Sequence, residues 1–223
     1  MPRGRFIVIE GSDGSGKSTQ FALLEAYFKN KGEGVVTYHF PQYSEPSSYF
    51  VKQYLNGSYG DADSLGAYTP SLFYALDRFQ AAQDIRAHLA QGKTVLADRF
   101  IGSNMAHQGQ KIASDSEREK YFTWLLDLEF TTLGIPKPDL NIVLLVPAEI
   151  AQHLTTQREE RSYTSKQQDI HEADIDHLRR AVEVYEKLCV LFPKEFTAIQ
   201  CVEAGKLLPI ATVAEKIIAA TRR

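Results

Sequence analysis

The sequence predicts an α/β fold in which a five-stranded parallel sheet is flanked by helices in three layers. Apolar segments of strand length alternate with amphipathic segments of helix length along the chain. Strands covered on both faces are apolar throughout, and helices usually supply the crossovers that parallel strands need. The expected strands cover residues 6–9, 35–40, 94–98, 140–146 and 196–202.

The first strand runs into a glycine-rich loop, and a helix is expected over 18–31. Phe21, Leu24 and Phe28 recur at the period of a helix with one apolar face, and Gly32 ends it. Pro41 stops the second strand. The order of strand, glycine loop and helix is typical of proteins that bind phosphate groups.

Later helices are expected over 70–91, 117–133 and 172–191, with a closing helix after Pro209. Pro70 stands at a first helical position, where its missing N–H costs nothing. The polar segment 155–170 lies between the fourth strand and the next helix, and is expected to be an excursion from the sheet. Nothing resembles an interdomain linker, so we expect one domain over residues 1–223.

The composition predicts a folded protein without a general affinity for polyanions. Hydrophobic residues make up 43% and charged residues 24%, and the net charge is -3. This balance gives no basic field for nucleic acid or anionic lipid. The apolar run 6–9 is too short for a signal peptide or a membrane span, and Cys189 and Cys201 lack disulfide or metal spacing. We therefore expect a cytoplasmic protein with neither nucleic acid nor membrane as a partner.

A phosphate-binding loop is predicted at residues 11–18. They read Gly-Ser-Asp-Gly-Ser-Gly-Lys-Ser, which fits G-x-x-x-x-G-K-[ST] between a strand and a helix. The lysine can reach the β- and γ-phosphates of ATP, and the final serine can ligate Mg²⁺. The residues expected to hold ATP are Gly11, Ser12, Asp13, Gly14, Ser15, Gly16, Lys17, Ser18 and Thr19.

The third strand ends in Asp98, followed at once by Arg99. An isolated Asp-Arg pair is ordinarily a surface ion pair, but the carboxyl ends of parallel strands gather at the ligand-binding edge. We therefore expect Asp98 to bind the metal and Arg99 to act in catalysis.

The phosphate loop itself contains a carboxylate, Asp13. It would repel a nucleotide unless a metal or the hydroxyl of a second ligand needs it. A substrate besides ATP is therefore expected.

The loop alone does not name the reaction, because GTPases, ATPases, motor domains and small-molecule kinases share it. The guanine-reading pattern Asn-Lys-x-Asp does not occur in the chain. A small kinase with a basic lid fits both the length and the polar segment. A kinase for another nucleotide or a deoxynucleoside, and a switch that binds ATP without transferring phosphate, are the alternatives.

Four segments in the same order resemble the thymidylate kinase family, which phosphorylates dTMP to dTDP. They are residues 6–20 around the loop, Leu-Phe-Tyr-Ala-Leu-Asp-Arg at 72–78, Asp-Arg-Phe-Ile-Gly-Ser-Asn-Met-Ala-His-Gln-Gly at 98–109, and Pro-Lys-Pro-Asp-Leu at 136–140. The resemblance spans essentially the whole chain. It implies the substrates dTMP and ATP, Mg²⁺ as cofactor, and a homodimer joined through helices 72–89 and 121–133.

The resemblance also implies roles at an acceptor site. Tyr74 stands where an aromatic ring stacks on thymine, Arg78 where an arginine hydrogen-bonds the base, and Arg99 where an arginine contacts the acceptor phosphate. Asp13 corresponds to a carboxylate associated with the 3′-hydroxyl and Mg²⁺. His107 stands where Tyr or Phe is usual. The other positions expected to contact the acceptor are Phe40, Pro41, Tyr43, Ser103, Asn104 and Gln108.

Two departures from the family pattern concern positive charge. After Phe40-Pro41 the family often has an arginine for the acceptor phosphate, and this chain has Gln42 and Tyr43. Either Arg78, Arg99 or Lys52 binds the acceptor phosphate in its place, or this chain holds the acceptor phosphate more weakly.

The second departure lies in the loop, where some members carry a catalytic arginine and this chain has Gly14. The lid, about 155–171, would then supply the arginine, with Arg161 favoured, Arg158 next and Lys166 a further candidate. The remaining histidines, at 39, 88, 153, 171 and 177, lack ligand spacing and are expected to be ordinary surface or core residues.

Overall fold

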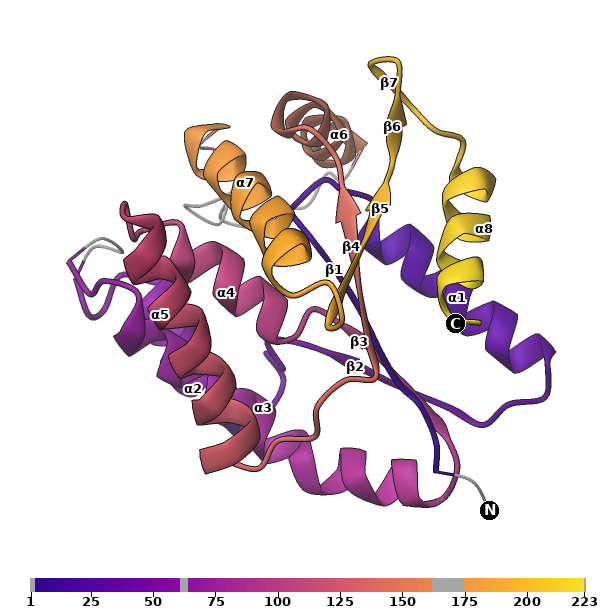
Figure 1. Cartoon of the computed structure of the whole chain (residues 1–223), viewed down its shortest axis with the longest axis horizontal. Coiled ribbons are helices and arrows are strands. Elements are labelled where there is room, and N and C mark those ends of the chain that lie inside the picture. The colour runs from indigo at the N-terminus through magenta and orange to yellow at the C-terminus, as the bar shows by residue number, and fades with distance from the viewer. Residues whose placement is uncertain (1–2, 61–63, 162–174, 223) are drawn as a thin grey trace.

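The computed structural model describes residues 3–60, 64–161 and 175–222, with the side chains of 157–161 excepted (Figure 1). Five strands form one parallel sheet in the order β2-β3-β1-β4-β5, so the predicted sheet is confirmed. The strands are β1 (Phe6–Gly11), β2 (Val35–His39), β3 (Thr94–Asp98), β4 (Leu140–Leu145) and β5 (Phe196–Gln200).

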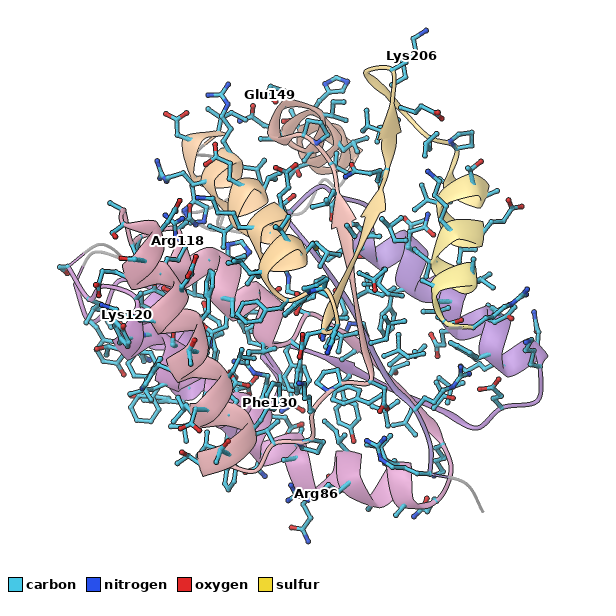
Figure 2. The ribbon with its side chains drawn as sticks, in the orientation of Figure 1. Arg86, Arg118, Lys120, Phe130, Glu149 and Lys206 are labelled. Atoms are coloured by element: carbon cyan, nitrogen blue, oxygen red, sulfur yellow. The ribbon has the colours of Figure 1, made fainter. Side chains whose placement is uncertain are left out.

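Helices cover both faces of this sheet, which gives the expected three layers (Figure 1). In β1, Phe6 and Val8 join the core beneath one set of helices, while Ile7 and Ile9 join the core beneath the other. The first set is α3 (Tyr68–Ala90), α4 (Ile101–Gly109), α5 (Asp115–Leu126) and α7 (Ile175–Leu191). The second set is α1 (Lys17–Asn30), α6 (Ala148–Arg161) and α8 (Ile210–Ala220). Charged side chains such as Arg86, Glu149 and Lys206 point outward (Figure 2).

Several elements differ from the expectation. The helices α4, α6 and α2 (Tyr49–Leu55), and the 3₁₀ turn η1 (Pro46–Ser48), were not predicted. The helix expected over 117–133 is α5 followed by a π-helical turn, η2 (Asp127–Thr132). The last strand ends at Gln200, and a small hairpin of β6 (Val202–Glu203) and β7 (Lys206–Leu207) follows.

The sheet order positions the functional site. From β1 in the middle, the chain fills one side with β2 and β3 and the other with β4 and β5. Ile9 of β1 is in register with Asp98 of β3, so the phosphate loop and the Asp98-Arg99 turn leave the sheet side by side. Such a switch point is where open parallel sheets bind ligands. None of the described helices combines the length and apolar character that crossing a membrane requires.

Candidate active site

The phosphate loop joins β1 to α1, as the sequence predicts. Gly11, Gly14 and Gly16 have positive φ angles of 144°, 75° and 85°. Glycine adopts such angles without steric cost, so the chain can curl and turn its N–H groups inward as an anion site. The Lys17 ammonium donates to the Ser12 carbonyl oxygen at 2.6 Å, which folds the side chain back over the loop.

Gly14 has no room for a side chain. A Cβ atom there would lie 2.0 Å from the Ala151 carbonyl oxygen and 2.7 Å from Oγ1 of Thr155, both on α6. A Cβ at Gly16 would meet nothing within 4 Å. The close approach of α6 therefore leaves no room for an arginine at position 14.

One cavity follows the loop from the sheet edge toward α8. Seven of the nine residues expected to hold ATP line it, while Gly11 and Ser12 do not. Its far end is formed by apolar side chains near β7 and α8, so it has a polar and an apolar end, as a nucleotide does. Burial, and then the charge of Arg99, lowers the pKa of Lys17 to about 8. Beyond the loop, the lining residues are Gln20, Asp98, Arg99, Leu154, Thr155, Cys201, Leu207, Leu208, Ile210 and Val213.

Two oxygen-bearing side chains in this cavity fit a divalent cation. Ser18 is exposed in the first turn of α1, and Asp98 lies opposite at the end of β3. Within the described chain, Oδ1 of Asp98 is buried without a hydrogen-bond partner, and Oδ2 is 3.4 Å from Nδ1 of His39. No cluster of three metal-ligating His, Cys, Asp or Glu side chains occurs in the described ranges. Mg²⁺ suits such a site, because it binds through one or two protein oxygens plus phosphates and water.

Arg99 is held in an uncommon backbone conformation between the loop and the sheet. Its φ is 66°, a region that residues with side chains rarely adopt, and such residues concentrate at functional sites. Its N–H donates to the Ile9 carbonyl at 2.9 Å. Its guanidinium forms an ion pair with Asp13 and donates from Nη1 to Oγ of Ser103 at 3.1 Å. This turn therefore places the Arg99 guanidinium against the phosphate loop.

The ion pair determines the charge state of both partners. Burial opposes ionisation of Asp13, but the charges of Arg99 and Lys17 outweigh it and hold the pKa of this carboxyl well below its usual range. Burial also opposes the charge on Arg99, but Asp13 raises its pKa further. The two side chains are therefore charged at neutral pH.

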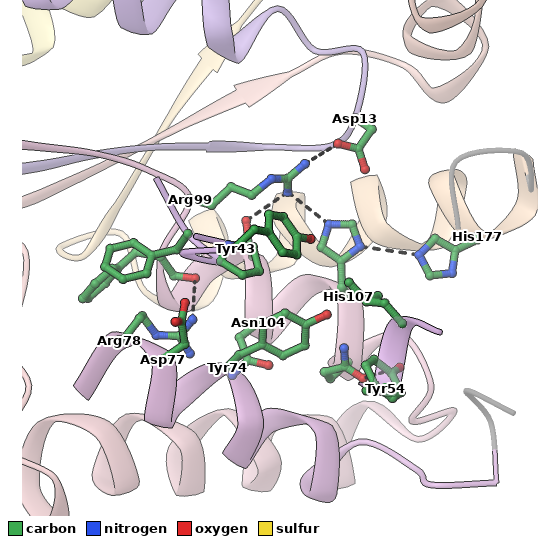
Figure 3. Close-up of a pocket in the computed structure, with 16 residues that line it drawn as sticks. Asp13, Tyr43, Tyr54, Tyr74, Asp77, Arg78, Arg99, Asn104, His107 and His177 are labelled. Atoms are coloured by element: carbon green, nitrogen blue, oxygen red, sulfur yellow. Dashed lines mark hydrogen bonds and ion pairs between the residues drawn. The ribbon is translucent and has the colours of Figure 1, made fainter. Parts of the chain in front are cut away.

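A second cavity, of about 210 Å³, lies between the loop, α3 and α4 (Figure 3). It shares Asp13 and Arg99 with the first cavity. All eleven residues expected to contact the acceptor line it, and Lys52 does not, because its ammonium donates to the Tyr43 carbonyl at 3.2 Å. The sequence did not predict five other lining residues: Tyr54, Leu55, Asp77, Phe100 and His177.

Arg78 is fixed at the floor of this cavity by a residue that the sequence did not indicate. Its Nε donates to Oε2 of Glu129 at 2.7 Å, and its Nη2 bonds the other carboxylate oxygen. Both side chains are almost completely buried, and the guanidinium lies 5.6 Å from the centroid of Phe100. Burial opposes the charge on Arg78, but Glu129 raises its pKa. Glu129 comes from the π-helical turn, where helical periodicity gave no sign of an inward acid.

Asp77 ties the segment after β2 to α3. Its Oδ2 accepts from the backbone N–H of Gln42 at 2.8 Å, and its Oδ1 accepts from Oγ of Ser47 at 2.5 Å. The Gln42 amide donates to the Asp77 carbonyl at 3.1 Å. The Gln42 side chain therefore links the segment after β2 to α3.

Glu10 lies beneath the site at the end of β1. It is fully buried, and it accepts from the N–H of Phe100 at 2.9 Å, from Oγ of Ser103 at 2.6 Å and from the hydroxyl of Tyr185 at 3.3 Å. Burial raises the pKa of its carboxyl. This network joins β1, α4 and α7 under Arg99. An acid within an otherwise apolar strand was the signal that could have revealed it.

Asn104 has an oriented amide beside Tyr74. Its Nδ2 donates to the Ser71 carbonyl of α3 at 3.1 Å. Its Oδ1 is buried and has no hydrogen-bond partner within the described residues. A buried acceptor without a donor is costly, so this atom is suited to a donor that a ligand brings.

The expectation that His177 is an ordinary surface or core residue is wrong, because its ring lines the acceptor cavity (Figure 3). Nδ1 of His107 is 3.4 Å from Nε2 of His177, and Nε2 of His107 is 3.3 Å from Nη1 of Arg99. Burial, and then Arg99, lowers the pKa of His107 to about 3. His177 could not be found from sequence, because α4 and α7 are far apart in the chain.

The described residues include only part of the expected lid. Residues 155–161 are the last turns of α6, so this part of the predicted excursion is helical. Arg158 and Arg161 belong to this helix, but their side chains lie outside the described residues. Lys166 and His171 also lie outside them.

Comparison with known proteins gives one consistent result. Residues 9–204 match the family model described as thymidylate kinase. A thymidylate kinase from Mycobacterium tuberculosis is 32% identical over 82% of this chain and 84% of its own length. One from Pelotomaculum thermopropionicum is 33% identical over 97% of this chain and 95% of its own. A solved Candida albicans thymidylate kinase matches with a TM-score of 0.72 at 23% identity, over 99% of this chain and 92% of its own, which shows the shared fold.

Proposed function

Because the chain belongs to the thymidylate kinase family, we propose that it transfers the γ-phosphate of ATP to dTMP, giving ADP and dTDP. The observation that carries the proposal is the meeting of two cavities at Asp13 and Arg99. The phosphate loop lines one cavity, and aromatic and amide side chains line the other. A donor and an acceptor bound in these cavities would bring their phosphates together at the shared residues.

ATP is the proposed donor. Its phosphates would lie in the loop against Lys17, and its base would lie among the apolar side chains near β7 and α8. Ser18 and Asp98 would hold Mg²⁺, because one is an exposed hydroxyl and the other carries a buried oxygen without a partner. Bound there, the ion would neutralise charge on the phosphates.

The acceptor base would lie between α3 and α4. The ring of Tyr74 can stack on a planar base, and the Arg78 fork, held by Glu129, can donate to a base carbonyl. The orphan Oδ1 of Asn104 would accept the N3–H of thymine. Cytosine has an acceptor at this position and would leave two acceptors facing each other, so the site should reject it.

The chemistry requires no general base, because a phosphate monoester is already anionic at neutral pH. The cost lies in bringing two anions together, so catalysis consists of positioning and charge neutralisation. Arg99 would contact the acceptor phosphate, with Ser103 and the loop fixing its guanidinium. Asp13 would accept a hydrogen bond from the 3′-hydroxyl of the acceptor.

The remaining positive charge is proposed to come from the lid, about 155–171. The contact of α6 with Gly14 leaves no room for an arginine at position 14 and supports this assignment. Arg161 is the favoured residue and Arg158 the next, because α6 carries both beyond Thr155 at the edge of the donor cavity.

We further propose that residues 1–223 form one cytoplasmic domain. We also propose that this domain associates as a homodimer through helices 72–89 and 121–133. Tyr68, Leu72, Leu76 and Phe79 are spaced as one face of α3 and are 40–47% exposed. Such an apolar stripe is typical of an association surface. Analytical ultracentrifugation tests this, and a wild-type monomer at micromolar concentration would contradict it.

A panel of acceptors tests the proposed reaction. ADP formation from ATP is measured with dTMP, dUMP, dCMP, dGMP and thymidine in turn. We expect the highest kcat/KM with dTMP, and a much lower value with dCMP because it lacks the N3–H. A preference for thymidine would identify a nucleoside kinase, and no ADP with any acceptor would favour the non-catalytic switch.

A further inference from the structure

The contact between His107 and His177 has the geometry of a hydrogen bond between ring edges. The two nitrogens are 3.4 Å apart, the ring planes differ by 24°, and the ring centroids are 5.7 Å apart (Figure 3). Since the centroids are much farther apart than the nitrogens, the rings meet edge to edge and not face to face. One proton between the two nitrogens satisfies both.

The donor and acceptor roles in this chain of contacts follow from Arg99. A guanidinium only donates, so Nε2 of His107, 3.3 Å from Nη1, must accept. A neutral imidazole then carries its proton on Nδ1, and this N–H donates to Nε2 of His177. The low pKa of His107 keeps it neutral at physiological pH, which preserves its acceptor nitrogen.

The pair is anchored to two helices outside the phosphate loop. His107 is on α4, and His177 is in the first turn of α7. The Gln110 amide donates to the His107 carbonyl oxygen at 3.3 Å, and its nitrogen contacts the His177 ring, 3.0 Å from Nε2 and 3.2 Å from Nδ1. The hydroxyls of Ser103 on α4 and Tyr185 on α7 are 2.9 Å apart, which joins the same helices. These contacts therefore hold the two imidazole rings in place between α4 and α7.

Arg99 is the main source of positive charge available to a ligand in the acceptor cavity, among the residues that the structure describes. Arg78 is committed to Glu129, Gln42 replaces an arginine, and Lys52 points elsewhere. Among the described lining residues, Arg99 is therefore the cation best placed to bind an acceptor phosphate. Its orientation decides whether that charge faces the phosphate.

We propose that His107 and His177 act as positioning residues: together with Asp13 and Ser103, the His177–His107 pair holds the Arg99 guanidinium at the meeting point of the two cavities. The proposal rests on the proposed function, because Arg99 binds the acceptor phosphate only if the acceptor is a nucleotide. It explains why a histidine can stand where Tyr or Phe is usual, since an imidazole both accepts from Arg99 and donates to α7.

Three variants and a control test this positioning. His107→Phe keeps a ring and loses both nitrogen contacts, His107→Gln keeps an acceptor for Arg99, and His177→Phe removes the acceptor for His107. We expect KM for dTMP to rise about tenfold in His107→Phe and about threefold in His177→Phe, with KM for ATP within twofold of wild type. His107→Gln should recover most of the loss. His88→Phe, at the end of α3 away from the cavity, should change nothing.

A second measurement does not depend on turnover. In long-range ¹H–¹⁵N spectra of the wild-type protein at neutral pH, His107 should show the Nδ1–H tautomer, and His177→Phe should change its Nδ1 shift. The Nε2–H tautomer, or an unchanged KM for dTMP in folded His107→Phe and His177→Phe, would overturn the inference. Wild-type protein that does not turn over dTMP would overturn the proposed function instead.

Discussion

Arg99 and Asp13 form an ion pair at the point where the donor and acceptor cavities meet. One residue follows β3 and the other lies in the phosphate loop after β1, so the pair joins neighbouring strands of the sheet. Each partner would face a different part of the acceptor, its phosphate or its sugar. The phosphate loop therefore also contributes to the wall of the second cavity.

Replacing Arg99 should abolish most of the activity without unfolding the protein. Arg99→Ala removes the charge shared by the two cavities, and an arginine at a transferred phosphoryl group is worth about 10³–10⁵ in kcat. We expect kcat with ATP and dTMP to fall by at least about a hundredfold, with little change in Tm. Arg86→Ala, at an outward-facing position of α3, is the control (Figure 2). Folded Arg99→Ala with near-normal turnover would show that this assignment is wrong.

Gly14 and Gly16 provide a matched pair for the contact between α6 and the loop. Both have positive φ, so alanine at either costs about 1–2 kcal/mol of backbone strain. Only Gly14→Ala also places its Cβ against the Ala151 carbonyl. Urea denaturation should therefore show a larger loss of unfolding free energy for Gly14→Ala than for Gly16→Ala. Equal losses would mean that α6 does not press on the loop as described.

Glu129→Gln should destabilise the fold and loosen base recognition. The substitution leaves the buried Arg78 charge without its partner, a change that typically costs about 3–5 kcal/mol. Glu117→Gln, which breaks an exposed pair with Lys120, should have no measurable effect on stability. Chemical denaturation gives the first result, and the dTMP to dCMP ratio of kcat/KM should fall in the same variant. A Glu129→Gln protein with wild-type stability and unchanged selectivity between dTMP and dCMP would contradict the assignment of Glu129 to base recognition.

ATP binding should weaken as the pH rises through about 8. Burial, and then Arg99, lowers the pKa of Lys17 to about 8, so its ammonium is charged below this pH and neutral above it. The polyphosphate favours the charged form, so Kd for ATP should be flat near pH 7 and rise toward tenfold per pH unit above 8. Titration calorimetry between pH 7 and 9 measures this. A Lys17→Met variant should bind weakly at every pH, and a flat profile in the wild type would contradict the assignment.

The sequence predicted the sheet better than the helices, for a physical reason. Strands buried on both faces, such as residues 6–9 of β1, are apolar throughout and can be recognised directly. Helix α4 buries polar side chains such as Ser103 and Gln108 next to apolar ones, so no apolar stripe marks it. Helix α6 is polar over most of its length, and its second half, from residue 155, was predicted as part of an excursion from the sheet.

The residues of the candidate site also fall into two groups, those that the sequence could predict and those that it could not. The loop and the Asp98-Arg99 turn could be predicted because their chemistry lies in short contiguous motifs. Glu129 and His177 could not, because each meets its partner only through tertiary packing: Glu129 meets Arg78 across 51 residues, and His177 meets His107 across 70. Sequence patterns carry no information about such pairs in a single chain.

The most direct test of the two-cavity site follows the phosphoryl group itself. The protein is incubated with dTMP and with ATP radiolabelled on its γ-phosphate, and the products are separated by chromatography. Transfer between the two cavities predicts that the label appears in dTDP in equal amount to the ADP formed. Label in inorganic phosphate alone, or label that stays in ATP, would contradict a shared donor and acceptor site at Asp13 and Arg99.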